Sequence, residues 1–166
     1  MCKEMPLDPS ILKKSMKKLI KIMALLFVAV AAAYAQPKHV NQDDHKLALE
    51  GYDPVAYFTE KKAIKGKSSL VAEHEGTKYQ FSSEANKNLF LKSPASYKPQ
   101  YGGWCAYAMG SYAEKVEVDP ETFKIVDGKL YLFYNKLFNN TLDTWNKDEA
   151  QLKANADKNW TKLITP

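Results

Sequence analysis

The sequence contains no arginine and only two cysteines, and each shortage excludes a class of function. Cys2 lies in a leader-like N-terminal segment, so the rest of the chain holds Cys105 as its single thiol. One thiol cannot form an intramolecular disulfide, and it cannot supply a four-cysteine zinc site or an iron–sulfur cluster. Without arginine, a twin-arginine export signal is also excluded.

The net positive charge is small outside the first 35 residues. Residues 1–35 hold six of the 24 lysines and two of the 19 acidic residues, which leaves 18 lysines against 17 acids, a net charge of +1, in residues 36–166. A nucleic-acid-binding protein carries a basic face. We therefore expect no nucleic-acid partner.

Residues 1–35 have the pattern of a secretory signal peptide. Five lysines between positions 13 and 21 precede the apolar run IMALLFVAVAAA (residues 22–33), and Ala33-Tyr34-Ala35 offers small residues for cleavage. The run is shorter than the roughly 20 residues that span a membrane. We expect cleavage before Gln36, export to the periplasm or the medium, and no membrane span afterwards. An uncleaved anchor is the alternative, and either Met1 or Met16 could be the start.

The remaining chain is expected to be one α+β domain, residues 47–163, after a flexible lead-in at residues 36–46. Its architecture would be a small antiparallel sheet of hairpins packed against several short helices. Residues 70–74 alternate in polarity and turn at Glu75-Gly76 into residues 77–81, which predicts a hairpin. Asp127-Gly128 predicts a second hairpin, because this pair tolerates the positive φ angles of a tight turn.

Other segments predict helices and one further strand. Ser82 or Ser83 can cap a helix that ends before Pro94, and residues 104–109 predict a short buried helix ended by Gly110. The apolar run at residues 55–58 predicts a strand. Apolar stripes at helical spacing predict two closing helices, the first with Phe138, Leu142 and Trp145 and the second with Leu152, Ala156 and Trp160.

The three histidines supply a residue type that a Ser–His–acid triad needs, but their presence alone does not indicate a triad. No Gly-x-Ser-x-Gly motif accompanies them. His39 and His45 lie in the polar lead-in, where we expect them to be exposed, and His74 lies beside a turn, where a solvated position at the end of a strand is the simpler interpretation. The sequence does not indicate an enzyme.

Cys105 and Met109 form the most suggestive pair for ligand chemistry. In a helix they lie four residues apart on one side, and a thiolate with a thioether suits Cu(I). His74 could complete a trigonal copper site. The alternative is packing, because cysteine is among the most buried residue types and methionine fills gaps in cores.

Four blocks of sequence together resemble the YHS domain. They are GYDPVAYF (residues 51–58), YQFSSE (79–84), FLKSPASY (90–97) and YGGWCA (101–106). Residues 118–136 and the motif ANADKNW (154–160) are similar to exported bacterial members, so that the resemblance covers residues 47–163. It implies a small α+β domain and a probable metal-binding module.

The chain also departs from the pattern of metal-associated YHS domains at three positions. Metal-associated YHS domains and the related TRASH domains carry cysteines at the positions that correspond here to Ala56, Ser82 and Asn86. None of these three side chains is a thiolate. A metal site in this chain would therefore be centred on Cys105 or be absent.

Two classes of function follow from these observations. The first is an exported, non-catalytic binding module for a soft metal ion such as copper, held by Cys105, Met109 and His74. The second is an interaction or structural domain without metal, in which Cys105 and Met109 pack the core and tyrosines and tryptophans meet a protein partner. An enzyme is the third and weakest hypothesis.

Overall fold

The computed structural model describes residues 39–165. Its contacts divide the chain into residues 1–36 and residues 37–166, and everything described below belongs to the second unit. The expected signal peptide lies outside the described residues. Within residues 39–165, no helix combines the length and the apolar character that crossing a membrane requires.

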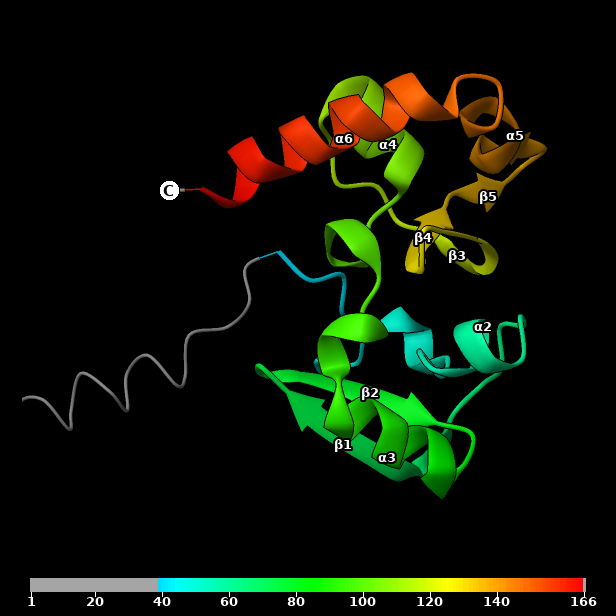
Figure 1. Cartoon of the computed structure of the whole chain (residues 1–166), viewed down its shortest axis with the longest axis vertical. Helices are drawn as coiled ribbons and strands as arrows, with labels where there is room; N and C mark the ends of the chain where they lie inside the picture. The colour runs from blue at the N-terminus through cyan, green and yellow to red at the C-terminus, as the bar shows by residue number, and fades with distance from the viewer. Residues whose placement is uncertain (1–38, 166) are drawn as a thin grey trace, which may run out of the picture. The chain divides into compact units, whose positions relative to one another are not determined.

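The expected α+β class is confirmed. The described elements are η1 (Leu49–Gly51), α2 (Ala56–Thr59), β1 (Lys67–His74), β2 (Thr77–Phe81), α3 (Glu84–Lys92), η2 (Pro94–Ser96), η3 (Gln100–Gly103), α4 (Ala106–Tyr112), β3 (Asp119–Val126), β4 (Lys129–Phe133), β5 (Asn135–Lys136), β6 (Asn139–Asn140), α5 (Thr141–Trp145) and α6 (Glu149–Ile164). Consecutive strands pair as three separate antiparallel hairpins (Figure 1).

Both predicted hairpins are confirmed. In β1–β2, Val71 pairs with Gln80 and His74 pairs with Thr77. In β3–β4, Asp127 and Gly128 form the turn with φ angles of 51° and 70°, the left-handed conformation that an Asp-Gly pair tolerates.

The capped helix is confirmed, whereas the predicted role of Gly110 is wrong. Ser83 precedes α3, and its side-chain oxygen accepts the backbone N–H of Asn86. The helix that carries Gly110, α4, runs past it and ends at Tyr112, followed by Ala113 with a φ of 59°. A β-carbon at Gly110 would lie 2.5 Å from the carbonyl oxygen of Leu152 in α6. The glycine therefore permits the close approach of two helices.

Two other predictions are corrected. Residues 55–58 do not form a strand, because helix α2 begins at Ala56 and the Asp53 carboxylate accepts the N–H groups of Val55 and Ala56 at its start. Phe138 is not part of the first closing helix, because α5 begins only at Thr141. Phe138 instead lies in the turn between β5 and β6.

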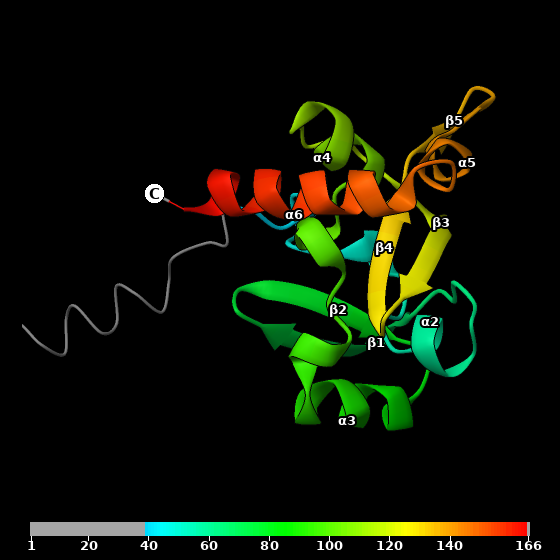
Figure 2. The ribbon, with the colours of Figure 1, turned by 45° about the horizontal axis from the view of Figure 1, so that its top comes forward.

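Strand β4 separates two hydrophobic clusters. Leu130 and Leu132 face the first cluster, together with aromatic residues of β2 and α3, whereas Tyr131 and Phe133 face the second cluster. This alternation follows from the two-residue period of a strand. In both Figure 1 and Figure 2, the hairpin β1–β2 and α3 lie in the lower part of the view, and α4, α5 and α6 lie in the upper part.

Candidate functional site

Cys105 is fully buried at the start of α4. Its Sγ accepts the backbone N–H of Tyr134 at 3.3 Å and lies 3.5 Å from Oγ1 of Thr141. Its own backbone N–H donates to the carbonyl oxygen of Val116, and its carbonyl oxygen accepts the N–H of Met109. The thiol is thus held by neutral groups in the interior of the protein.

Met109 and His74 do not share the surroundings of Cys105. The Met109 side chain is fully buried in the second cluster, whereas Cys105 belongs to the first. His74 lies at the end of β1, where its ring meets Phe90 edge-on and its Nε2 lies 3.5 Å from the carboxylate of Glu75. Among residues 39–165, no group of three or more His, Cys, Asp or Glu side chains could hold a metal ion. The copper hypothesis for these three residues therefore rests on the sequence.

The three positions at which related domains carry thiolates do converge, and they surround the buried carboxylate of Asp53. Oδ1 accepts the N–H groups of Val55 at 2.9 Å and Ala56 at 3.4 Å. Oδ2 accepts the N–H of Ser82 at 2.8 Å, its hydroxyl at 2.7 Å and Nδ2 of Asn86 at 2.8 Å. These donors satisfy a carboxylate that is 0 % exposed. Asp53 was not among the site residues expected from the sequence, although the Asp-Pro pair before an apolar run is typical of a helix start.

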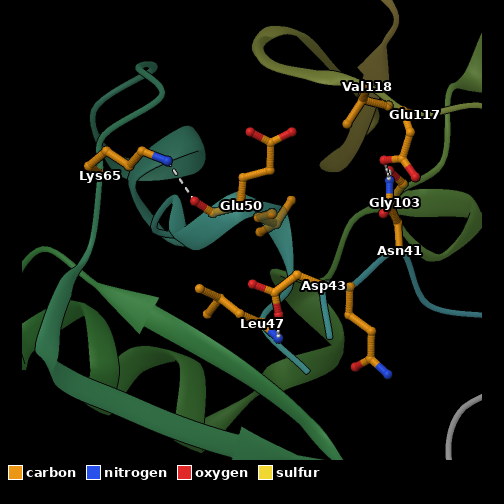
Figure 3. Close-up of a pocket in the computed structure, with 10 residues that line it drawn as sticks. Asn41, Asp43, Leu47, Glu50, Lys65, Gly103, Glu117 and Val118 are labelled. Carbon is orange, nitrogen blue, oxygen red and sulfur yellow. Dashed lines mark hydrogen bonds between the residues drawn. The ribbon is translucent and has the colours of Figure 1, made fainter. Parts of the chain in front are cut away.

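A pocket of about 420 Å³, which we call the acidic pocket because Asp43, Glu50 and Glu117 line it, lies beside the loop that contains Asp43 and Glu50 (Figure 3). Asp43 accepts the N–H groups of His45 and Leu47, and Lys65 donates to the backbone carbonyl of Glu50 at 2.6 Å. The Glu117 carboxylate accepts Nδ2 of Asn41 at 3.1 Å, also on the wall of this pocket. These contacts mainly hold the loop in place.

A second pocket, of about 400 Å³, is the more apolar of the two, and we call it the Trp160 pocket. Its apolar lining comes from four parts of the chain: Val40, Ala48, Leu49, Tyr79, Pro99, Trp160 and Ile164. The charged pair at this pocket is Lys98 with Glu75, with 2.6 Å between Nζ and the carboxylate. The Lys98 side chain holds the pKa of the Glu75 carboxyl below its usual range, so this carboxylate is ionised at neutral pH. The volume suits a small apolar group.

The wall of the Trp160 pocket includes His39, which the sequence analysis placed in an exposed lead-in. Its ring meets Trp160 edge-on with 6.0 Å between centroids, and its carbonyl oxygen accepts Nε1 of Trp104 at 3.1 Å. A β-carbon at Gly102 would lie 2.1 Å from that same oxygen. His39 is therefore partly buried, and Gly102 allows a close approach of the two backbone segments. His45 is exposed, as expected.

Residues 55–101 match the family model of the YHS domain. The chain carries a YHS domain. The match extends from α2 to η3 and includes Ser82 and Asn86, two of the donors to Asp53. No curated protein and no solved structure matches the chain. The YHS domain suggests a metal-associated module, and α4 to α6 lie beyond the matched residues.

The YHS domain supplies only part of the Trp160 pocket. Tyr79, Lys98 and Pro99 lie within the matched residues, whereas Val40 and Trp160 lie outside them. The pocket is therefore a feature of residues 39–165 together and does not follow from the matched segment alone.

Proposed function

We propose that this protein is an exported, non-catalytic binding module whose Trp160 pocket takes an apolar group of its ligand. The observation that carries this proposal is the pocket itself, a cavity of about 400 Å³ with a mainly apolar lining and the Lys98–Glu75 pair beside it. Binding sites commonly combine an apolar lining with a few polar groups that fix orientation.

The surroundings of Cys105 support a role in packing. A nucleophilic cysteine needs an adjacent base or another group that favours the thiolate. Here the sulfur meets the amide of Tyr134 and the hydroxyl of Thr141, and neither stabilises a thiolate as a histidine or a cation would. The same reasoning disfavours Cu(I) ligation, so the soft-metal module is our second candidate, favoured by the YHS match.

Export is supported by the lysine-rich start, the short apolar run and Ala33-Tyr34-Ala35. The intact mass of the protein from the periplasm or medium of a bacterial host is expected to correspond to residues 36–166, allowing for cyclisation of the N-terminal Gln36. A mature species that keeps residues 22–33 would contradict the proposal of a cleaved signal peptide.

Binding in the Trp160 pocket can be tested with p-cresol, a soluble molecule with one apolar ring. In ¹H–¹⁵N NMR titrations of the exported protein, we expect saturable shifts at the amides of Gly102, Gly103 and Ile164, which line the pocket. Ile164→Lys places a charge beside the apolar wall. We expect this variant to bind p-cresol about tenfold more weakly, which is a loss of about 1.4 kcal/mol in binding free energy.

The matched control is Leu91→Lys on α3, because Leu91 is 51 % exposed and Ile164 is 43 % exposed. Leu91 does not line the pocket, so this variant is expected to bind p-cresol as the wild type does. Shifts spread evenly over the surface, or equal weakening by both variants, would contradict a binding site in the Trp160 pocket.

A further inference from the structure

The turn between β5 and β6 displays two large apolar side chains to solvent. Leu137 is 89 % exposed and Phe138 is 109 % exposed, which makes them the most exposed large hydrophobic residues in the described part of the chain. We call these two residues the hairpin tip. Burying such side chains would be favourable, but the folded monomer leaves both of them exposed to solvent.

The backbone of the hairpin tip is also unfavourable. Leu137 and Phe138 have φ angles of 52° and 66°, the left-handed region that two-residue hairpin turns usually fill with Asn-Gly. A side chain with a β-carbon is strained in this region. Neither the exposure nor the conformation stabilises the fold, so the pair of residues calls for a role outside the folded monomer.

The hairpin tip cannot occupy the Trp160 pocket of its own chain. The tip is followed closely by α5 and by the first turn of α6, whereas Ile164, which lines the pocket, is in the last turn of α6. The 16 residues of α6 extend over about 24 Å. Figures 1 and 2 agree in placing β5 near the start of α6 and away from its C-terminal end.

We propose that the hairpin tip of one molecule docks in the Trp160 pocket of a second copy. This inference rests on the proposed function, because it requires that the pocket takes an apolar group. The two surfaces are complementary: Leu137 and Phe138 are apolar like the lining, and the exposed Lys136 beside the tip can approach the Glu75 carboxylate, which Lys98 already contacts at the edge of the pocket.

Such a contact joins two different surfaces, so it is head-to-tail and leads to rings or open chains of molecules. Phe buries about 150–250 Å² when it is enclosed. The surface area that two side chains and their surroundings can bury is therefore below the roughly 1,200 Å² that a stable interface buries. We expect the association to be weak and reversible.

The first test compares two variants with the wild type by sedimentation equilibrium of the exported protein. The tip variant, Leu137→Asn with Phe138→Gly, keeps a favourable turn sequence, and the pocket variant is Ile164→Lys. Between about 10 µM and about 1 mM, we expect the average mass of the wild type to rise with concentration and each variant to associate at least about tenfold more weakly. The melting temperature of the tip variant should be equal to or higher than that of the wild type.

The deciding test mixes the two variants. The tip variant retains its pocket and the pocket variant retains its tip, so the mixture is expected to form a 1:1 heterodimer that cannot extend. A tip-to-tip contact would not be restored by mixing, and that result would overturn the head-to-tail inference. Leu91→Lys, on α3, serves as the matched surface control and should associate as the wild type does.

A wild type that is monomeric over the whole concentration range would also overturn the inference. If p-cresol still binds the pocket of that monomer, only self-docking fails and the proposed function stands. Tip-dependent sedimentation of the monomer with phosphatidylglycerol vesicles would assign Leu137 and Phe138 to a lipid surface and would likewise overturn docking in a second copy.

Discussion

The two sides of β4 are stabilised in different ways. The side that holds β1, β2 and α3, which lie within the matched residues and give it the name YHS side, also contains a fully buried carboxylate, Asp53, with backbone, hydroxyl and amide donors directed at it. The other side contains aromatic rings in edge-on and tilted contact, in which the centroid of Trp145 lies 5.4 Å from that of Phe133 and 5.9 Å from that of Tyr131. Nε1 of Trp145 is buried without a hydrogen-bond partner.

This difference has a physical consequence for mutation. Directional hydrogen bonds to a buried charge require one geometry, and the loss of one partner leaves the others unsatisfied. Aromatic packing depends on volume and tolerates replacements that conserve it. We therefore expect the YHS side to be sensitive to chemistry and the aromatic side to be sensitive to size.

The largest effect is expected for Asp53→Ala. Removal of the carboxylate leaves the donors of Ser82 and Asn86 without their acceptor, and the free energy of unfolding should fall by about 5 kcal/mol, a large part of the stability of an ordinary domain. Urea unfolding measures this change. Ser82→Ala, which removes a single hydroxyl donor, is the control and should cost about 1.5 kcal/mol. Equal effects of both variants would contradict the role of Asp53 as the centre of the network.

Trp145→Ala should reduce the free energy of unfolding by about 3–5 kcal/mol, because the ring is fully buried in the second cluster. Trp160→Ala is expected to cost less than half as much, since Trp160 is only partly buried beside its pocket. Chemical denaturation of the two variants measures the difference. An unchanged denaturation midpoint for Trp145→Ala would mean that α5 does not close the second cluster.

Cys105→Ser should lower the free energy of unfolding by about 1–2 kcal/mol, because the smaller oxygen atom leaves a gap in the core where the sulfur now meets Tyr134 and Thr141. Met109→Leu should cost under about 1.5 kcal/mol, because the volumes are similar. Competition with a chromogenic Cu(I) chelator separates packing from ligation. Packing predicts no competition by the wild type, whereas competition that both substitutions weaken, Cys105→Ser most, would establish the soft-metal module.

The smallest effect is expected at Tyr52, which lies at the surface of the YHS side. Its hydroxyl donates to the Glu121 carboxylate at 2.8 Å, and this bond raises the pKa of Tyr52 to about 12. Because the pKa of an unfolded tyrosine is about 10, the folded state holds this proton more tightly. The resulting stability is present below about pH 10 and is lost as the pH rises to about 12.

Tyr52→Phe should therefore cost about 0.5 kcal/mol at pH 8, since the pair is exposed to solvent. The difference from the wild type should shrink between about pH 10 and about pH 12. Urea unfolding at each pH measures this trend. A difference that grows with pH would reverse the sign and would contradict the hydrogen bond to Glu121.

The local signals in the sequence predicted much of the fold. Asp127-Gly128 and Ser83 act through their nearest neighbours, and both predictions are confirmed. The run at residues 55–58 was misread because four apolar residues fit either a strand or a helix, and the deciding partner, Asp53, was not considered. Phe138 matched the helical spacing by chance. The turn that contains it has neither Gly nor Asp at its two central positions, so the sequence does not indicate a hairpin there.

The site was harder to predict because it depends on contacts between distant segments. The Trp160 pocket brings His39 against Trp160, and the network around Asp53 reaches Asn86. Periodicity cannot report such contacts. The resemblance did indicate Ala56, Ser82 and Asn86 as corresponding positions, and the structure shows that they share one centre.

The close contact between Gly110 and α6 determines which half of the molecule can mature first. The first cluster, within the described part of the chain, contains no residue after Tyr134, so it can close while the C-terminal segment is still being synthesised. The second cluster cannot form completely until Ala156 and the rest of α6 are present. During that interval the apolar face of α4 is open to chaperones and proteases, and seating of α6 against Gly110 ends this exposure.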